Sequence, residues 1–240
     1  MAEHILKAFD AELGDLRRRI SELGGLAEKM LADAVKALAR QDTALAQTVI
    51  AADARMDTIQ REIEEQAILT IARRQPMAVD LRETVSAIRV AGDLERIGDL
   101  AKNIAKRVVA IAGQPQPSKT VLGIQSMSDL VLAQLKDVLD AYSGRDVAKA
   151  GDVWQRDGAV DALYTSLFRE LLTYMMEDPR NISFCVHLLF CAKNVERIGD
   201  HTTNLAETIH YLVTGNTLPA DRPKDDQANF AMAEVKSSEG

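Results

Sequence analysis

The sequence has few of the residues that interrupt helices. Its 240 residues include 13 glycines and 6 prolines, and only 4% are aromatic. Alanine, leucine, glutamate, arginine and aspartate are abundant, a composition typical of helical proteins. With 47% hydrophobic and 27% charged residues, the chain can form one large globular domain or two small ones. The composition therefore favours an all-α protein.

Long hydrophobic runs, a signal-peptide pattern and a cysteine framework are also lacking. The longest apolar stretch, around residues 184–192, contains His187 and is too short to cross a bilayer. The charged N-terminus lacks the apolar segment of a signal peptide. Cys185 and Cys191 lie six residues apart on one expected helix, where they cannot form a disulfide, and we interpret them as buried thiols. We therefore expect a cytoplasmic protein without direct membrane insertion.

A positive net charge and the common catalytic motifs are absent as well. The formal net charge is −7 and the pI is about 5.2, so general affinity for nucleic acid is not expected. An acidic chain also binds free phosphate poorly unless a cation bridges the two. No Walker-type glycine loop, dinucleotide fingerprint, serine-nucleophile elbow or His-Glu-x-x-His motif occurs. The sequence therefore predicts a protein that is not an enzyme.

What the sequence does contain is helical periodicity with few interruptions. Prolines, glycines and capping aspartates divide it into six long helices. We expect these helices at residues 5–40, 43–74, 78–112, 119–142, 146–177 and 179–215. Residues 113–118 are the clearest linker, with one glycine and two prolines, and the polar residues 216–240 are expected to form a mobile tail.

The pentapeptide Glu-Arg-Ile-Gly-Asp occurs twice, at 95–99 and at 196–200, and an asparagine follows each copy, Asn103 or Asn204. The copies start 101 residues apart, and the preceding helices align at an offset of 104. This duplication predicts two tandem, pseudo-symmetric three-helix bundles of antiparallel helices, at 1–112 and 119–215. Because a helix of ~30 residues is ~45 Å long, the molecule should be elongated.

Acidic residues recur four apart on the second and third helices of each expected bundle. The third helix of the first bundle has an apolar stripe from Leu81 to Ile111, and a second stripe of Glu95, Asp99 and Asn103 lies away from it. Gly98 falls between the two stripes, where the lack of a side chain lets a neighbouring helix approach closely. We therefore expect four surface-facing carboxylates in a groove of each bundle.

A multivalent cation would relieve the repulsion between these carboxylates. Oxygen ligands suit magnesium, calcium, manganese or iron better than zinc, and we expect divalent or trivalent ions, with iron, manganese, magnesium and zinc as candidates. Pairing with Arg96 and Arg197, or a solvated face that only aids solubility, are the alternatives. The predicted ligands are Asp53, Asp57, Glu95, Asp99, Asn103, Asp157, Asp161, Glu196, Asp200 and Asn204.

A ferritin-like metal-binding or redox protein is the main alternative function. Di-iron carboxylate bundles have inward-facing Glu-x-x-His motifs on two helices. Glu207 and His210 match this motif once, but the duplicate positions are Lys106 and Val109. A purely structural helical scaffold is a third possibility, and the metal content of the purified protein would separate it from the others.

Four segments of the chain resemble the PhoU family of phosphate-uptake regulators: Gln75–Arg82, Glu95–Asp99, Tyr174–Asp178 and Glu196–Asp200. The resemblance covers roughly residues 5–215. It implies two tandem three-helix bundles with multinuclear metal sites on their surfaces. It also implies that these sites use a Glu/Asp-x-x-x-Asp pattern, which the chain has at 53/57, 95/99, 157/161 and 196/200.

The resemblance also implies a function and a set of partners. A protein similar to this family would be a cytoplasmic, non-enzymatic negative regulator of phosphate uptake and phosphate homeostasis. It would act in signal transduction as an adaptor between a phosphate ABC transporter and a sensor histidine kinase. The implied partners are the ATPase subunit of the transporter, the kinase and a second copy of the chain in a homodimer.

Overall fold

The computed structural model describes residues 2–114 and 118–219, and the side chains of residues 9–114 and 120–219. Within these ranges the chain is helical and contains no strand, as the composition predicts. The expected tail lies mostly outside the described residues, because only 216–219 of its residues are included. No helix in the described ranges combines the length and the apolar character that crossing a membrane requires.

The first bundle consists of three long helices joined by short turns. They are α1 (Ala2–Arg40), α2 (Thr43–Arg74) and α3 (Ala78–Ala110). The bounds expected for the second helix are confirmed, because Asp42 caps α2 by accepting a hydrogen bond from the Leu45 amide at 2.9 Å. At the other end, Gln75 adopts a left-handed conformation with φ of 48° and precedes Pro76, which together end α2.

The second bundle repeats this order with two differences: its second helix is split in two, and the helix expected from residue 179 begins with a 3-10 turn at Pro179–Asn181, so that α7, the long helix that follows, starts at Ile182. It consists of α4 (Ser118–Gly144), α5 (Val147–Gln155), α6 (Asp157–Glu177), a short 3-10 helix η1 (Pro179–Asn181) and α7 (Ile182–Thr214). Asp146 caps α5 by accepting a hydrogen bond from the Lys149 amide at 3.0 Å. The N-terminal capping role expected for this aspartate is therefore confirmed.

The continuous helix expected at 146–177 is wrong, because the helix is interrupted at Arg156. This residue has φ of −87° and ψ of 4°, outside the helical region. Its carbonyl accepts a hydrogen bond from the side-chain amide of Gln134 on α4, at 3.1 Å. A contact with another helix thus satisfies the carbonyl at the break, which helical periodicity alone cannot reveal. The break makes Asp157 the first residue of α6.

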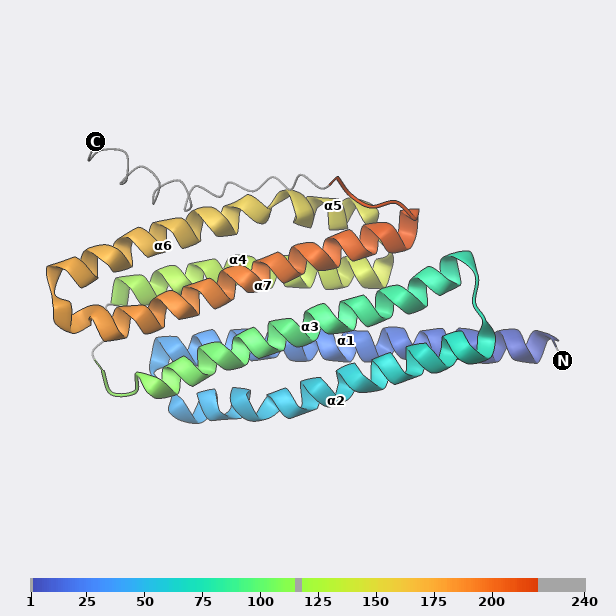
Figure 1. Ribbon diagram of the computed structural model, residues 1–240, viewed down its shortest axis with the longest axis horizontal. Helices are drawn as coiled ribbons and strands as arrows, with labels where there is room; N and C mark the ends of the chain where they lie inside the picture. Colours follow the sequence, from blue (N-terminus) through green and yellow to red (C-terminus); the bar gives the residue numbers. More distant parts are fainter. Residues whose placement is uncertain (1, 115–117, 220–240) are drawn as a thin grey trace, which may run out of the picture.

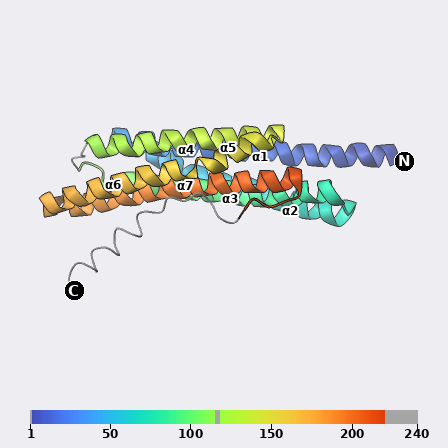
Figure 2. The same cartoon turned by 90° about the horizontal axis from the view of Figure 1, so that it is seen from above.

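The helices of both bundles run along one axis, so the molecule is an elongated rod, as predicted from helix length (Figures 1 and 2). The bundles lie side by side, with α3 against α7 and α1 against α4. Gly24 of α1 allows one of these close approaches, since a Cβ atom there would lie 2.6 Å from a methyl group of Leu139 on α4. The two bundles therefore share an extensive interface.

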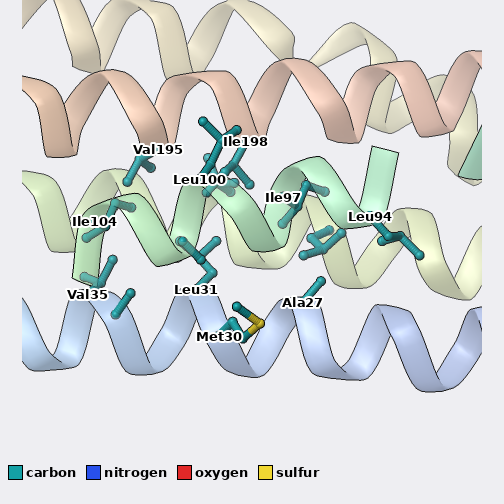
Figure 3. Packing of buried hydrophobic residues seen from close by; sticks show 14 of the residues in the cluster. Ala27, Met30, Leu31, Val35, Leu94, Ile97, Leu100, Ile104, Val195 and Ile198 are labelled. Atoms are coloured by element: carbon teal, nitrogen blue, oxygen red, sulfur yellow. The ribbon is translucent and has the colours of Figure 1, made fainter. Parts of the chain in front are cut away.

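The hydrophobic core is continuous across that interface. Figure 3 shows α3 lying between α1 and α7, with Leu100 and Ile104 of α3 near Leu31 and Ile198 of the two neighbouring helices. The predicted apolar stripe of α3 is confirmed from Leu94 to Ile111, which are buried. Leu81 is an exception at 38% exposed, because it lies in the first turn of α3, at the end of the rod where few helices cover it.

Polar contacts also join the two bundles. Glu83 of α3 is only 4% exposed and forms ion pairs with Arg17 of α1 and with Arg145. Arg145 lies in the turn between α4 and α5, so this buried carboxylate connects the first bundle to the second. Farther along α3, Asp93 Oδ1 lies 2.8 Å from Nδ1 of His201 on α7. The bundles are thus held together by apolar packing and by ion pairs.

Candidate metal centre

The antiparallel packing of α2 and α3 brings the four acidic residues of the first bundle together. We call Asp53 and Asp57 of α2 with Glu95 and Asp99 of α3 the first acidic cluster. Burial raises the pKa of Glu95 above its usual value, and the neighbouring charges of Asp99 and Asp57 raise it further. The proximity expected from the sequence is therefore confirmed for this cluster, because these carboxylates influence one another across two helices.

A lysine that the sequence reasoning did not consider lies inside this cluster. Nζ of Lys102 is 2.6 Å from Asp53 Oδ2 and 2.6 Å from Asp99 Oδ1. Its side chain is 18% exposed, and those of Asp53 and Asp99 are 17% and 30% exposed. Arg96, which the sequence suggested as a partner, approaches Glu95 and Asp99 at 3.7 Å and is 64% exposed. Lys102 is therefore the main counter-charge of the cluster.

Gly98 determines how closely α2 and α3 approach beside this cluster. It is buried, and a Cβ atom there would lie 2.9 Å from Cε and 3.1 Å from Cγ of Met56. Met56 is fully buried one residue before Asp57. The close helix approach expected at this glycine is therefore confirmed, and the side chain that uses the space is Met56.

The second acidic cluster consists of Asp157 and Asp161 of α6 with Glu196 and Asp200 of α7. Asp157 and Glu196 are 4% and 8% exposed, whereas Asp161 and Asp200 are half-buried. The expectation of surface-facing carboxylates is thus wrong for Asp157 and Glu196. The reason is that α6 begins at Asp157, and its first turn packs directly against α7.

The second cluster neutralises its acids differently from the first. Oγ1 of Thr203 donates a hydrogen bond to Asp157 Oδ1 at 2.9 Å. Thr203 occupies the position equivalent to Lys102, 101 residues later. Lys193 forms an ion pair with Glu196 at 2.8 Å and lies over the ring of Tyr164, and its side chain is 46% exposed. A threonine hydroxyl thus replaces the ammonium group that bridges two acids in the first cluster.

The two predicted asparagine ligands lie in different surroundings. Asn103 is exposed on α3. Asn204 of α7 lies with its Nδ2 atom 3.4 Å from Asp93 Oδ1 on α3, next to the contact between Asp93 and His201. The side chains of Asn204 and His201 are therefore directed toward the interface between the bundles.

The second cluster has the type of ligand atoms that bind a cation, but its side chains are not arranged around one. In the described part of the chain, no three histidine, cysteine, aspartate or glutamate side chains are arranged so that they could hold a metal ion. Four carboxylates on two adjacent helices nevertheless form a donor set that suits a hard cation. Binding there would require rotation of some of these side chains.

The residues of the ferritin-like motif do not face a common site. Glu207 accepts a hydrogen bond from Nε1 of Trp154 at 3.3 Å. Nδ1 of His210 lies 3.0 Å from the carbonyl oxygen of Asn216, near the end of α7. These contacts direct the glutamate toward α5 and the histidine toward the C-terminal end of its own helix.

Sequence reasoning missed Lys102, Thr203 and Met56. Lys102 could have been recognised, because it follows Asp99 by three residues and such pairs share one helix face. Its contact with Asp53 depends on the packing of α2 against α3. The burial of Asp157 depends on the helix break at Arg156, for which the sequence has no proline signal.

Comparisons with known proteins agree with this architecture. A model of the PhoU domain matches residues 20–108 and again residues 124–209. Over 226 residues, the chain is 60% identical to a protein of Rhizobium meliloti (strain 1021) named phosphate-specific transport system accessory protein PhoU homolog, and the match covers 94% of this chain and 95% of that protein. A protein of the same name from Caulobacter vibrioides (strain NA1000 / CB15N) is 52% identical, with 94% and 98% covered.

Two crystal structures have the same fold. PhoU from Pseudomonas aeruginosa superposes with a TM-score of 0.84 at 40% identity, covering 87% of this chain and 100% of that one. The phosphate transport system regulatory protein PhoU from Streptococcus pneumoniae superposes with a TM-score of 0.81 at 30% identity, covering 88% and 99%.

Proposed function

This chain belongs to the PhoU family, and we propose from this membership that it is an accessory protein of a phosphate-specific transport system and a negative regulator of phosphate uptake. The main support is that the family match extends over both bundles and that the relatives with this name align over nearly the whole chain. The proposed protein is cytoplasmic and non-enzymatic. It would regulate phosphate homeostasis by binding other proteins.

The proposed mode of action is that of an adaptor. The partners would be the ATPase subunit of the transporter and the sensor histidine kinase of the phosphate response, and a second copy of the chain would form a homodimer. Exposed apolar side chains at two of the turns between helices support this proposal. Met77 is 80% exposed at the α2–α3 turn, and Met176 is 84% exposed at the end of α6, before the turn that leads to α7. These turns lie at opposite ends of the rod (Figure 1), so two partners can bind without overlapping.

We also propose a cation site at the second acidic cluster. The residues that would hold the ion are Asp157, Asp161, Glu196 and Asp200. Bound there, a metal ion would offset part of the negative charge of four carboxylates, and an open coordination position on the ion would accept an anionic group of a partner. Manganese, magnesium and iron suit this all-oxygen donor set.

The adaptor function is tested by affinity purification of the tagged full-length chain from cells grown with ample phosphate. We expect the transporter ATPase and the sensor kinase to co-purify and to be identified by mass spectrometry. In a strain that lacks the chain, we expect phosphate uptake to remain high when phosphate is ample. Recovery of neither protein, together with normal repression of uptake in the deletion strain, would contradict the proposed function.

A further inference from the structure

A groove lies between α1 and α4, along the interface that joins the two bundles. Its volume is about 200 Å³. Because a water molecule takes up about 30 Å³ in the liquid, the groove has room for a small ion together with some of its water. The polar residues that line it are Lys36 and Arg40 of α1 and Gln125, Ser128 and Asp129 of α4.

A comparison of the two repeats shows why the groove is open. At the offset of 104 residues, Ser128 corresponds to Gly24, and Val35 corresponds to Leu139. The side chain of Leu139 packs closely over Gly24, where an added Cβ atom would lie 2.6 Å from a methyl group. Val35, which lines the groove, has one carbon atom fewer than leucine. The packing between α1 and α4 is therefore less complete beside Ser128 than beside Gly24.

A buried polar group without a partner lines this groove. Ser128 is 1% exposed, and its hydroxyl oxygen has no hydrogen-bond partner in the described part of the chain. A buried hydroxyl group in this state destabilises the fold unless a water molecule or an ion supplies the missing partner. Rotation about the Cα–Cβ bond can direct the hydroxyl of Ser128 toward an ion in the groove.

The groove carries local positive charge, although the formal net charge of the chain is −7. Lys36 and Arg40 lie one helical turn apart on α1, and neither forms an ion pair with another residue that the structure describes. Their counterparts in the second bundle are Asp140 and Gly144, so these two cations belong to this groove alone. With Asp129 included, two positive charges and one negative charge line the groove, and an anion is favoured there.

From these observations we propose that the groove binds inorganic phosphate directly. Lys36 and Arg40 contact its negatively charged oxygens, and Ser128 donates a hydrogen bond to one of them. Phosphate keeps at least one proton at neutral pH, so it can donate a hydrogen bond to the carboxylate of Asp129. Sulfate has no proton at this pH and is repelled by Asp129. The groove therefore selects phosphate over sulfate.

This inference rests on the proposed function, because it names the ligand by which a regulator of phosphate uptake detects the phosphate level. The cations come from the first bundle, and Ser128 and Asp129 come from the second. Bound phosphate thus links α1 to α4 and stabilises the contact between the bundles.

The test is calorimetric titration of the full-length chain with sodium phosphate, in a buffer with a metal chelator so that phosphate cannot bind through a metal ion. We expect saturable binding with a Kd of about 1 mM, and at least about tenfold weaker binding of sulfate. Lys36→Met with Arg40→Met should weaken phosphate binding at least about tenfold, because two charge-assisted hydrogen bonds are lost. Lys106→Met removes a charge from the exposed face of α3, outside the groove, and should leave the Kd unchanged.

Two further variants separate recognition of phosphate from folding. Asp129→Asn should bind sulfate nearly as tightly as phosphate, because an amide can donate a hydrogen bond to either anion. Ser128→Ala should bind phosphate about fivefold more weakly. Without phosphate, however, it should melt no lower than the wild type, since the hydroxyl that it removes has no partner in the described fold.

Thermal melting gives an independent measurement on the same proteins. In the wild type, 10-fold more phosphate than the Kd should raise the melting temperature by about 3–5 °C relative to the same concentration of sulfate. The Lys36→Met, Arg40→Met variant should lose this difference, and circular dichroism checks that it is folded.

Three outcomes would overturn the proposal: no saturable phosphate binding below about 10 mM, equal affinity for phosphate and sulfate, or an unchanged Kd without Lys36 and Arg40. Tighter binding of glycerol phosphate than of phosphate would also overturn it, because the ligand would then be a phosphate ester. The purification experiment is independent of these titrations. Failure to recover the transporter ATPase and the kinase overturns the adaptor function, whereas a failed titration with both partners recovered overturns only direct phosphate binding.

Discussion

The α2–α3 interface of the first bundle and the α6–α7 interface of the second are built from equivalent positions but are stabilised differently. In the first, Lys102 neutralises Asp53 and Asp99, and Met56 packs on Gly98. In the second, Thr203 donates to a buried Asp157, and a Cβ atom added at Gly199 would meet Val160 at an ordinary contact distance. Duplication thus preserved the acids and the glycines, while the residues that neutralise the acids and fill the space diverged.

The largest difference in stability between the two interfaces should come from adding side-chain volume at Gly98, where α2 and α3 pack closely. Gly98→Leu must displace Met56, which is fully buried and cannot move into solvent. We expect a loss of about 3 kcal/mol in the free energy of unfolding, and a melting temperature about 6–10 °C lower. Gly92→Leu is the matched control, because no atom lies within 4 Å of a Cβ added there. An unchanged melting temperature of Gly98→Leu would remove the packing role of this glycine.

The next largest loss of stability should come from removing the Thr203 hydroxyl group, which donates a hydrogen bond within the second acidic cluster. Thr203→Val keeps the shape of the side chain but removes the donor to Asp157, which is buried. We expect a loss of about 2 kcal/mol, since hydrogen bonds to charged groups contribute this much. Thr202→Val should have little effect, because the hydroxyl of Thr202 bonds only to the Gly199 carbonyl of its own helix in the described contacts. Chemical denaturation measures the free energy of unfolding of both variants. Equal losses would show that the hydrogen bond to Asp157 contributes no more than a bond within the helix.

Replacing the two repeated glycines by alanine should affect the free energy of unfolding differently. A Cβ at 199 would lie 3.4 Å from Val160, so Gly199→Ala should gain about 0.5–1 kcal/mol from the higher helix propensity of alanine. A Cβ at 98 would lie 2.9 Å from Met56, so Gly98→Ala should gain nothing or lose stability. Thermal melting of the two variants measures this difference. Stabilisation by both substitutions would mean that α2 does not pack more tightly on Gly98 than α6 packs on Gly199.

The smallest effect concerns the charge of Glu95 in metal-free protein. Because the folded-state pKa of Glu95 is raised, ionisation of this carboxyl disfavours the folded state, and its contribution to stability declines as the pH rises through the folded-state pKa. Glu95→Gln should therefore be more stable than the wild type at pH 7, by about 0.5 kcal/mol.

The same variant should lose its advantage below pH 4.5, the ordinary glutamate value, where Glu95 is protonated in both the folded and the unfolded state. Melting temperatures at pH 7 and pH 4 measure the change. Glu65→Gln, which removes the same charge from the exposed face of α2, is the matched control. A destabilised Glu95→Gln at pH 7 would mean that the negative charge stabilises the fold.

Much of the fold follows from local signals in the sequence. Asp42, Asp146 and the residues around Pro76 and Pro179 end or begin helices through their own backbone and side-chain chemistry, so the six-helix order could be predicted. The repeated Glu-Arg-Ile-Gly-Asp segment identified the duplication and the helix crossing at Gly98. These features depend on residues that are neighbours in the chain.

What could not be predicted depends on contacts between helices. The break at Arg156 is satisfied by Gln134 of α4, and the counter-charge of Asp53 comes from Lys102, 49 residues later. The contacts of His201 and Asn204 with Asp93 cross from one bundle to the other. A sequence pattern shows which residues share a helix face, but it does not show which face of another helix they meet.

The core that α3 and α7 share has a consequence for the origin of the chain. A single repeat of three helices would leave the outer face of its third helix, including Leu100 or its counterpart, without cover. Two such repeats can cover these faces by pairing around a twofold axis, the commonest symmetry of protein pairs. The present rod has the arrangement that would result if the genes of two identical ancestral subunits had fused. Fusion would also free each copy to change on its own, so that one acidic cluster now has a lysine where the other has a threonine.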